Sequence, residues 1–281
     1  MQYIELKCIV SPAETGNEIL IALLSEAGYE SFLETEEALF AYIRQDMFDE
    51  QALTTLRAAC KQCAFTFSCD RQTIADENWN ALWESNYEPV LIDNRCYIRA
   101  PFHPHRDDVE YEIRIEPKMS FGTAHHPTTM QMIRYLLEED CSGKTVLDMG
   151  TGTGILAILS VLRGAKRVLA IDNDDWAYRN CLENVAENQI QTIETLLGDA
   201  RSIRQTPYDI CLANINRNIL LQDMKRYVDA LKQQGTLLVS GFYLHPDLTV
   251  IQTEAAKHNL VFHSYKEQEG WVAARFVLEN K

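Results

Sequence analysis

Acidic residues and glycines gather in one stretch of this 281-residue chain. A short apolar run leads into Asp148, and glycine then follows at positions 150, 152 and 154. Glycine lets a backbone turn approach a ligand without interference from a Cβ atom. The next expected strand ends at Asp172, whose carboxylate can accept hydrogen bonds from both hydroxyls of a ribose. These residues predict a site for a nucleotide-like cofactor.

The spacing of the glycines distinguishes between classes of cofactor. A dinucleotide fold needs G-x-G-x-x-G, so that a helix N-terminus can hold a pyrophosphate, whereas here Ile155 follows the third glycine. The strand, glycine loop, helix and strand-end acid are similar to those of S-adenosylmethionine-dependent methyltransferases. That resemblance implies S-adenosylmethionine as cofactor, with Asp148 near its charged amino group. The alternative is a strand-to-helix turn that holds no ligand.

The elements that position these residues alternate between strand and helix from residue 145 onward. We expect strands at 146–149, 167–172, 194–198, 208–213 and 236–241, and helices at 153–163, 174–187, 218–233 and 246–258. This order predicts the α/β class, with a doubly wound sheet of seven strands. Its polar strand ends carry Asp148, Asp172, Asp199 and Asn214, at the edge where open α/β sheets bind ligands.

The last two expected strands, 260–267 and 271–278, leave only Glu269 and Gly270 at their join. They predict an antiparallel C-terminal hairpin added to an otherwise parallel sheet. This addition is typical of methyltransferase sheets and not of plain dinucleotide folds.

The first 70 residues predict a separate α+β unit. Strands at 2–10, 29–34, 38–44 and 64–70 and helices at 14–27 and 46–60 follow one another in the order β-α-β-β-α-β. This is the ferredoxin-like order, which covers one face of a sheet with two helices and leaves the other face for a partner. We expect a ferredoxin-like substrate-recognition domain at 1–72, a linker helix at 73–89 and a methyltransferase domain at 90–281.

The expected linker helix carries an aromatic stripe. Trp79, Leu82, Trp83 and Tyr87 fall on one helical face. Packing between the domains explains such a stripe, and direct contact with a substrate is the alternative.

Charge and cysteine content restrict the partners and the compartment. The formal charge of −15 disfavours long nucleic acids, which need a basic face. The first 75 residues hold 12 Asp or Glu against 5 Lys or Arg, a net of −7 that would attract a basic protein or simply form a solvated acidic surface. Eight scattered cysteines favour a reduced, cytoplasmic protein, and the single Cys60-x-x-Cys63 pair has no second pair that would make a metal site. We expect neither a membrane span nor a signal peptide.

Several motifs together carry a family resemblance. They are Trp79-Asn-Ala-Leu-Trp83, Phe121-Gly-Thr-Ala-His-His-Pro-Thr-Thr129, the glycine loop with Ile155-Leu-Ala-Ile158, Asn184 and Asn188, Ala213-Asn-Ile215, and Glu269-Gly-Trp-Val272. With them the chain resembles, over almost its full length, the methyltransferases of large-subunit ribosomal protein eleven, the PrmA type. The resemblance implies that ribosomal protein eleven, free or on the ribosome, is the partner. The acidic charge and the lack of an apolar span predict no specific nucleic acid and no membrane as partners.

The same resemblance implies roles for individual residues. In that family the residues at the positions of Thr129, Gly150, Asp172 and Asn214 hold the cofactor. We expect Gly152, Phe121 and Gly122 to contribute to the cofactor site, and Asp199 to accept a hydrogen bond from the adenine amino group. The chain departs from the family pattern at Ala124, where glycine is usual, and at His125 and Asn216. The loss of glycine at 124 is expected to alter how its loop closes over the cofactor, and Asn216 with Arg217 to add polarity near the acceptor.

Asn214 is the expected catalytic residue. Its side-chain carbonyl can accept a hydrogen bond from an incoming amine and so direct the nitrogen lone pair at the methyl group. The alternative role for Asn214 is to cap the next helix. The resemblance implies Lys and α-amino groups as acceptors. Three other functions stay open: methylation of another protein, methylation of an exocyclic amine of a nucleic acid, and a non-catalytic binding module that has kept the cofactor fold.

Overall fold

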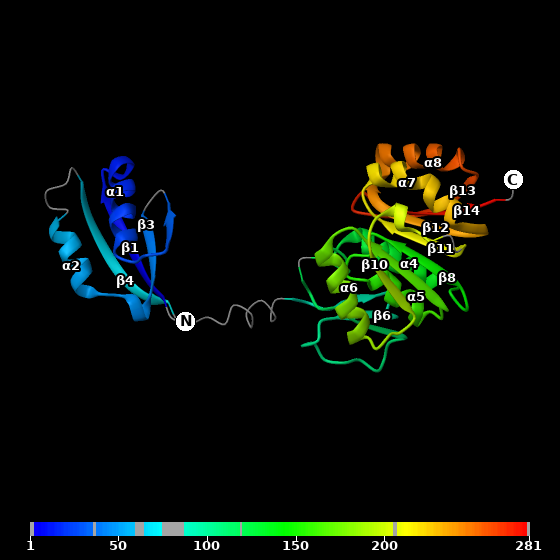
Figure 1. Cartoon of the computed structure of the whole chain (residues 1–281), viewed down its shortest axis with the longest axis horizontal. Coiled ribbons are helices and arrows are strands. Elements are labelled where there is room, and N and C mark those ends of the chain that lie inside the picture. Colours follow the sequence, from blue (N-terminus) through cyan, green and yellow to red (C-terminus); the bar gives the residue numbers. More distant parts are fainter. Residues whose placement is uncertain are drawn as a thin grey trace. The chain divides into compact units, whose positions relative to one another are not determined.

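Two sets of elements follow one another along the chain, one in residues 1–87 and one in residues 88–281 (Figure 1). The computed structural model describes residues 3–35, 38–59, 65–74, 87–118, 120–204 and 207–279. Among these residues, no helix has the length and apolar character needed to cross a membrane. The expected linker helix, with Trp79 and Trp83, and the Cys60-x-x-Cys63 pair lie outside the described residues.

The first set builds a four-stranded sheet. Its elements are β1 (Tyr3–Ser11), α1 (Ala13–Glu26), β2 (Ser31–Glu34), β3 (Leu39–Arg44), the 3-10 turn η1 (Gln45–Met47), α2 (Glu50–Ala59) and β4 (Thr66–Ile74). The strands lie in the order β2-β3-β1-β4, and every neighbouring pair is antiparallel. Alternate residues of β1 face a core shared with the two helices, which includes Leu6, Leu20 and Leu53. The opposite face of β1 exposes Lys7 and Ile9.

The second set begins with a small sheet and continues into a large one. Its elements are β5 (Val90–Ile92), β6 (Cys96–Arg99), β7 (Tyr111–Arg114), α4 (Pro127–Glu138), β8 (Thr145–Met149), α5 (Ile155–Leu162), β9 (Arg167–Asp172), α6 (Asp175–Glu187), β10 (Ile193–Leu197), η3 (Ala200–Ser202), β11 (Tyr208–Asn214), α7 (Arg217–Ala230), β12 (Leu231–Tyr243), η4 (Leu244–Leu248), α8 (Thr249–Ala256), β13 (Leu260–Gln268) and β14 (Trp271–Leu278).

The large sheet has the order β10-β9-β8-β11-β12-β14-β13. The first five strands are parallel, so their carboxyl ends share one edge. The last two strands run antiparallel to their neighbours and are joined by Glu269 and Gly270, both at positive φ. The expected α/β class with a large mixed sheet is confirmed.

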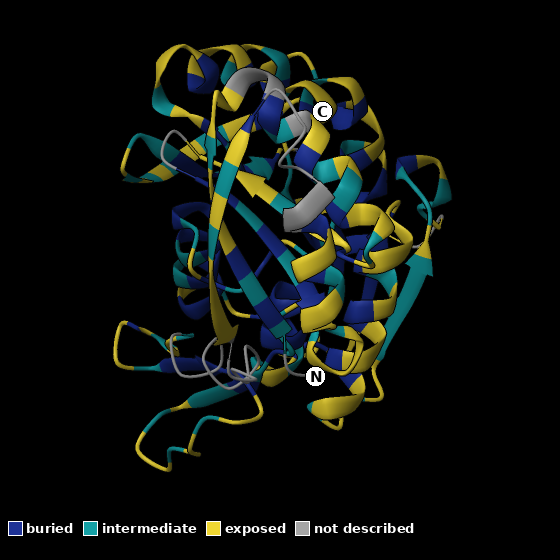
Figure 2. Ribbon diagram, turned by 90° about the vertical axis from the view of Figure 1, so that its left-hand side faces the viewer, coloured by how far each residue is buried: buried dark blue, intermediate teal, exposed yellow. Residues whose placement is uncertain are grey.

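Helices cover both faces of this sheet. Successive strand residues turn to opposite faces, and Val146 belongs to the core beneath α4, α5 and α6, whereas Leu147 belongs to the core beneath α7 and α8. The two groups of helices lie on opposite sides of the strands in Figure 1. Buried residues are most frequent on inner strands such as β8, whereas the edge strand β13 and the outer faces of the helices carry many exposed residues (Figure 2). This layering leaves the carboxyl edge of the sheet accessible.

Candidate functional site

The glycine loop between β8 and α5 has a backbone that side chains would not tolerate. Gly150, Gly152 and Gly154 all have positive φ, at 65°, 57° and 82°. A Cβ atom at Gly152 would lie 2.2 Å from the carbonyl oxygen of Phe121, and one at Gly150 would lie 2.3 Å from Cγ2 of Ile215. The loop is therefore pressed against two other segments of the same sheet edge, which explains the alternating glycines.

Asp172 closes β9 beside this loop. Its Oδ2 accepts a hydrogen bond from the backbone N–H of Gly152 at 2.9 Å, and its Oδ1 accepts one from Asp174 N–H at 3.0 Å. Each carboxylate oxygen has a further lone pair for a ligand. The two backbone donors fix the carboxylate at the mouth of the loop.

A cleft of about 390 Å³ opens at this edge of the sheet. Five of the residues expected at the site are brought together around it: Phe121, Gly150, Gly152, Asp172 and Asn214. Its volume is in the range that binds small molecules and cofactors. The cleft is also lined by Ser120, Asn173, Asp174, Trp176, Ala177 and Ile215.

Trp176 is a lining residue that sequence reasoning missed. It lies in the first turn of α6, and 70% of its surface is exposed although its side chain is large and apolar. Asp174 caps that helix and accepts a hydrogen bond from the Trp176 N–H at 2.7 Å, so the backbone there is fixed. The signal in the sequence was the position of Trp176, an aromatic residue four positions after the strand-end acid Asp172.

Asp148 lies beneath the loop and is only 1% exposed. Thr151 Oγ1 donates to its Oδ2 at 2.6 Å, while its Oδ1 has no hydrogen-bond partner among the described residues. Burial raises the pKa of Asp148 to about 7, since an ionised carboxylate is poorly stabilised away from water. Asp148 itself does not line the cleft, so the structure places this expected site residue beneath the glycine loop.

Asn214 ends β11 and faces the cleft. Its Nδ2 donates to Thr129 Oγ1 at 3.3 Å, and its Oδ1 is buried with no hydrogen-bond partner in the described part of the chain. Thr129 is fully buried in the first turn of α4, which begins at Pro127 after the capping residue His126. The structure thus brings Thr129 to Asn214, although Thr129 itself does not line the cleft.

The neighbouring residues explain why Asn214 has this unpaired oxygen. Asn216, and not Asn214, caps α7, because its side chain accepts from Ile219 N–H at 3.1 Å. Arg217 is held by Asp247 at 2.5 Å. Both Asn216 and Arg217 therefore have structural partners, and the expectation that they add polarity near the acceptor stays a prediction.

Gly122 and Asp199 lie outside the set of residues that line the cleft. The carbonyl oxygen of Gly122 accepts from Thr153 Oγ1 at 2.6 Å, which ties the two loops together. Asp199 caps η3 and forms an ion pair with Arg201 at 2.6 Å. The Arg201 guanidinium lowers the pKa of Asp199 to about 2. The structure therefore does not bring Asp199 together with the other expected residues.

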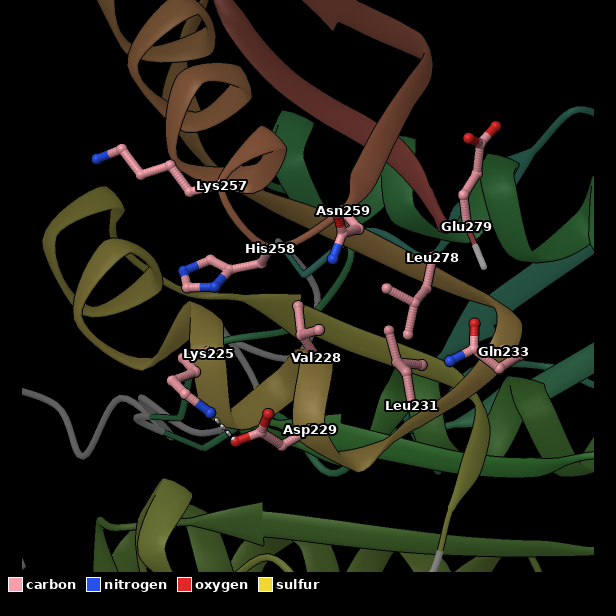
Figure 3. A pocket seen from close by; sticks show the side chains of 10 residues that line it. All are labelled: Lys225, Val228, Asp229, Leu231, Gln233, Lys257, His258, Asn259, Leu278 and Glu279. Carbon is pink, nitrogen blue, oxygen red and sulfur yellow. Dashed lines mark hydrogen bonds and ion pairs between the residues drawn. The ribbon is translucent and has the colours of Figure 1, made fainter. Parts of the chain in front are cut away.

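A second hollow lies at the opposite end of the sheet (Figure 3). It includes Leu231 at the start of β12 and Leu278 at the end of β14. Its Lys225 forms an ion pair with Asp229 at 2.6 Å, and its Lys257 forms one with Glu254 at 2.7 Å. None of the expected site residues lines this hollow, which carries no comparable set of unpaired buried atoms.

Comparison with protein families gives one match that spans almost the whole chain. The family model described as ribosomal protein L11 methyltransferase (PrmA) matches residues 14–279. A ribosomal protein L11 methyltransferase of Bacteroides fragilis is 44% identical over 99% of this chain and 100% of its own length. One of Porphyromonas gingivalis is 43% identical over 94% of this chain and 91% of its own length.

A solved structure agrees with these sequence matches. The crystal structure of a ribosomal protein L11 methylase from Lactobacillus delbrueckii subsp. bulgaricus superimposes with a TM-score of 0.63 and 27% sequence identity. The match covers 69% of this chain and 100% of that chain.

Proposed function

This chain belongs to the ribosomal protein L11 methyltransferase family, and on that premise we propose that it transfers methyl groups from S-adenosylmethionine to amino groups of ribosomal protein L11. The observation that carries the proposal is the position of Asn214. Asn214 lines the cleft together with the glycine loop and Asp172, and its side-chain oxygen is buried with no hydrogen-bond partner among the described residues. That arrangement fits an enzyme that must orient an amine beside a bound nucleoside.

The residues around the cleft fit S-adenosylmethionine. Asp172 has lone pairs for the ribose hydroxyls. Gly150 and Gly152 bring backbone atoms to the cleft at two positions where a Cβ atom would collide with Ile215 or Phe121. Asp148 does not line the cleft, and we propose that its carboxyl group acts on the positive charge of the amino group from beneath the glycine loop. When bound, this cofactor supplies a methyl group that is already activated by its attachment to a sulfonium.

Asn214 acts on the acceptor by orientation. Its Oδ1 accepts a hydrogen bond from an amine N–H, which points the nitrogen lone pair away from the amide and toward the methyl group. Thr129 holds the Asn214 Nδ2 and so determines which side of the amide faces the cleft. Methyl transfer would form the C–N bond and break the C–S bond, leaving S-adenosylhomocysteine and a methylated ammonium that then releases one proton to solvent. No proton needs to pass to Asn214.

The acceptor must be neutral before it can attack. For a lysine with a pKa of about 10.4, deprotonation at pH 7 costs roughly 4.6 kcal/mol, whereas an α-amino group costs about 1 kcal/mol. Apolar side chains that line the cleft, such as those of Phe121, Trp176 and Ile215, lower the pKa of the amine by desolvation. Both kinds of amine are therefore proposed as acceptors.

The two parts of the chain are proposed to divide the work. We propose that residues 1–72 are a ferredoxin-like substrate-recognition domain and that residues 90–281 are a methyltransferase domain with a seven-stranded sheet. The antiparallel four-stranded sheet of the first part supports the first assignment. The strand order of the large sheet and its C-terminal hairpin support the last.

The open alternatives have less support. Enzymes that methylate exocyclic nucleic-acid amines typically use N-P-P-Y, whereas this chain has Asn214-Ile-Asn-Arg217. The base would lack an aromatic ring to stack on at that position. A non-catalytic module would not need a buried, unpaired amide oxygen on a residue that lines the cleft.

Incubation with methyl-labelled S-adenosylmethionine tests the function. The substrates are purified ribosomal protein L11, intact ribosomes and ribosomal RNA, and the label is located by mass spectrometry of peptides and nucleosides. We expect label on lysine or α-amino nitrogens of L11. Label on RNA, on another protein alone or on no substrate would contradict the proposal.

A further inference from the structure

Three asparagines at intervals of four residues form one buried row on α6. They are Asn180, Asn184 and the C-capping residue Asn188, and the first two are at most 1% exposed. Residues four apart lie on the same face of a helix, so the row is continuous. It faces the segment from Arg114 to Glu116, which leads from β7 toward Phe121 at the cleft.

The row bonds to this segment as a neighbouring strand would. Asn188 Oδ1 accepts from Arg114 N–H at 2.9 Å, and its Nδ2 donates to the Arg114 carbonyl at 2.7 Å. Asn184 Oδ1 accepts from Glu116 N–H at 2.8 Å, and Asn180 Nδ2 donates to the Glu116 carbonyl at 3.4 Å. Side-chain amides therefore satisfy backbone groups at two alternate residues.

Asn184 differs from the other two because it also reaches the glycine loop. Its Nδ2 donates to the carbonyl oxygen of Thr153 at 2.8 Å, in a fully buried position. Thr153 in turn donates from its N–H to the Phe121 carbonyl at 3.0 Å and from its Oγ1 to the Gly122 carbonyl at 2.6 Å. One side chain thus joins helix, incoming segment and glycine loop.

We propose that Asn184 is a positioning residue for cofactor binding, because it fixes the Phe121 wall of the cleft against the glycine loop. The proposal rests on the cofactor site described above. Phe121 and Gly152 approach so closely that a Cβ atom at Gly152 would meet the Phe121 carbonyl at 2.2 Å. A small displacement of Thr153 would therefore move both walls of the cleft.

The chemistry of the amide explains why asparagine is needed at this position. The Asn184 Oδ1 accepts from Glu116 N–H, and its Nδ2 donates to the Thr153 carbonyl. No carboxylic or aliphatic side chain of that size both accepts and donates at neutral pH. Removal of the amide leaves the Glu116 N–H and the buried Thr153 carbonyl without their partner. Buried polar groups that lose their partner favour a rearranged backbone.

The test compares cofactor affinity in variants of the full chain. Asn184→Ala removes both bonds, and Asn184→Asp keeps the acceptor but loses the donor to Thr153. We expect each to weaken the binding of S-adenosylhomocysteine at least about tenfold in calorimetry, well below the unfolding temperature. We also expect the KM for S-adenosylmethionine to rise, while kcat at saturation stays within about threefold. Asn188→Ala is the matched control, since it removes bonds to the same segment and not to the loop.

A second route keeps the test decisive if the Asn184 variants do not fold. Thr153→Val removes the bond to Gly122 from the other side of the same joint and is expected to weaken cofactor binding similarly. The inference is overturned if the Asn184 variants bind S-adenosylhomocysteine as well as wild type does. If those variants do not fold, equal binding by Thr153→Val overturns it. It is also overturned if Asn188→Ala weakens binding as much as Asn184→Ala. If wild type itself does not bind, the proposed function fails instead.

Discussion

Asn214 and Asn216 are two residues apart and have different surroundings. The side chain of Asn216 is used to cap α7, whereas the Asn214 amide is held by Thr129 and keeps one oxygen unpaired among the described residues. Capping was the alternative role for Asn214, and the structure gives that role to Asn216. A buried, unpaired acceptor costs stability and is therefore expected to have a function.

Asn214→Ala is expected to retain cofactor binding and to lose turnover. The variant removes the acceptor that orients the amine, and groups of this kind typically contribute about 10²–10³-fold to kcat. Calorimetry with S-adenosylhomocysteine and single-turnover methylation of L11 measure the two effects separately. Thr129→Ser keeps the hydroxyl that accepts from Asn214 Nδ2 and is the control. Thr129→Val removes that hydroxyl and is the variant compared with it. A normal rate in Asn214→Ala would remove the orienting role.

Asp148 is expected to give the free energy of unfolding a measurable pH dependence. Burial raises its pKa to about 7, so the folded protein holds a proton that the unfolded chain loses near its ordinary value of 3.8. The unfolding free energy should therefore fall as pH rises from about 4 to 7 and level off above that, by at most about 1.4 kcal/mol per pH unit.

Urea unfolding at a series of pH values, without cofactor, measures this slope. In Asp148→Asn the contribution of the carboxyl group is absent, so the variant should gain stability relative to wild type as pH rises toward 7. An unchanged difference between the two proteins across pH 4–8 would show that Asp148 titrates normally.

At the scale of elements, local patterns predicted the strands and helices well, and errors arose where a long-range contact decides. The expected helix 218–233 was wrong at its end, because α7 stops at Ala230 and β12 begins at Leu231. The sequence there favours a helix, but Leu231 pairs with Tyr208 of β11. The positive φ of Gln234 then turns the chain into the regular part of the strand.

The candidate site was likewise predictable where local sequence patterns define it, and not where long-range contacts between side chains do. Glycines and strand-end acids have types and spacings that single out the cleft, as at Gly150 and Asp172. The pairing of Asp199 with Arg201 and the joint made by Asn184 depend on side-chain directions, which no period in the sequence specifies.

The loop before α4 contains a residue in an unfavourable backbone conformation. Ala124 has φ of 68°, the left-handed region in which glycine is favoured, and its methyl group is fully buried. This is the position where the family usually has glycine. The departure therefore leaves the loop in a conformation suited to glycine, with the strain offset by burial of the methyl group.

Substitutions at Ala124 are expected to separate these two effects. Ala124→Gly relieves a backbone strain of about 1 kcal/mol. It also removes a buried methyl group and makes the unfolded chain more flexible, which together cost a similar amount. The free energy of unfolding should therefore change by less than about 1 kcal/mol. Ala124→Val should cost at least about 2 kcal/mol, because a β-branched residue is poorly tolerated at positive φ. Thermal and urea unfolding measure both. Strong stabilisation by glycine would mean that the methyl group contributes little.

At the scale of the whole molecule, charge is unevenly placed. The chain carries −15 overall, and −7 of this lies in its first 75 residues, in the part proposed to recognise the substrate. Several charged residues of the second part are instead paired with one another, such as Arg201 with Asp199 and Arg217 with Asp247, and none of these four lines the cleft. Long-range attraction is therefore expected to act on the protein substrate and much less on the cofactor.

The KM for L11 is expected to rise steeply between about 50 and 300 mM salt, because screening shortens the range of this attraction. The affinity for S-adenosylhomocysteine should change by less than about twofold over the same range, which makes it an internal control. Neutralising exposed acids of the first part in Glu26→Gln/Glu30→Gln should raise the KM for L11 at low salt by several-fold. The matched variant Asp107→Asn/Glu279→Gln removes as much charge from the other part and should have a smaller effect. Equal effects of the two variants would mean that net charge, and not its position in the chain, steers the substrate.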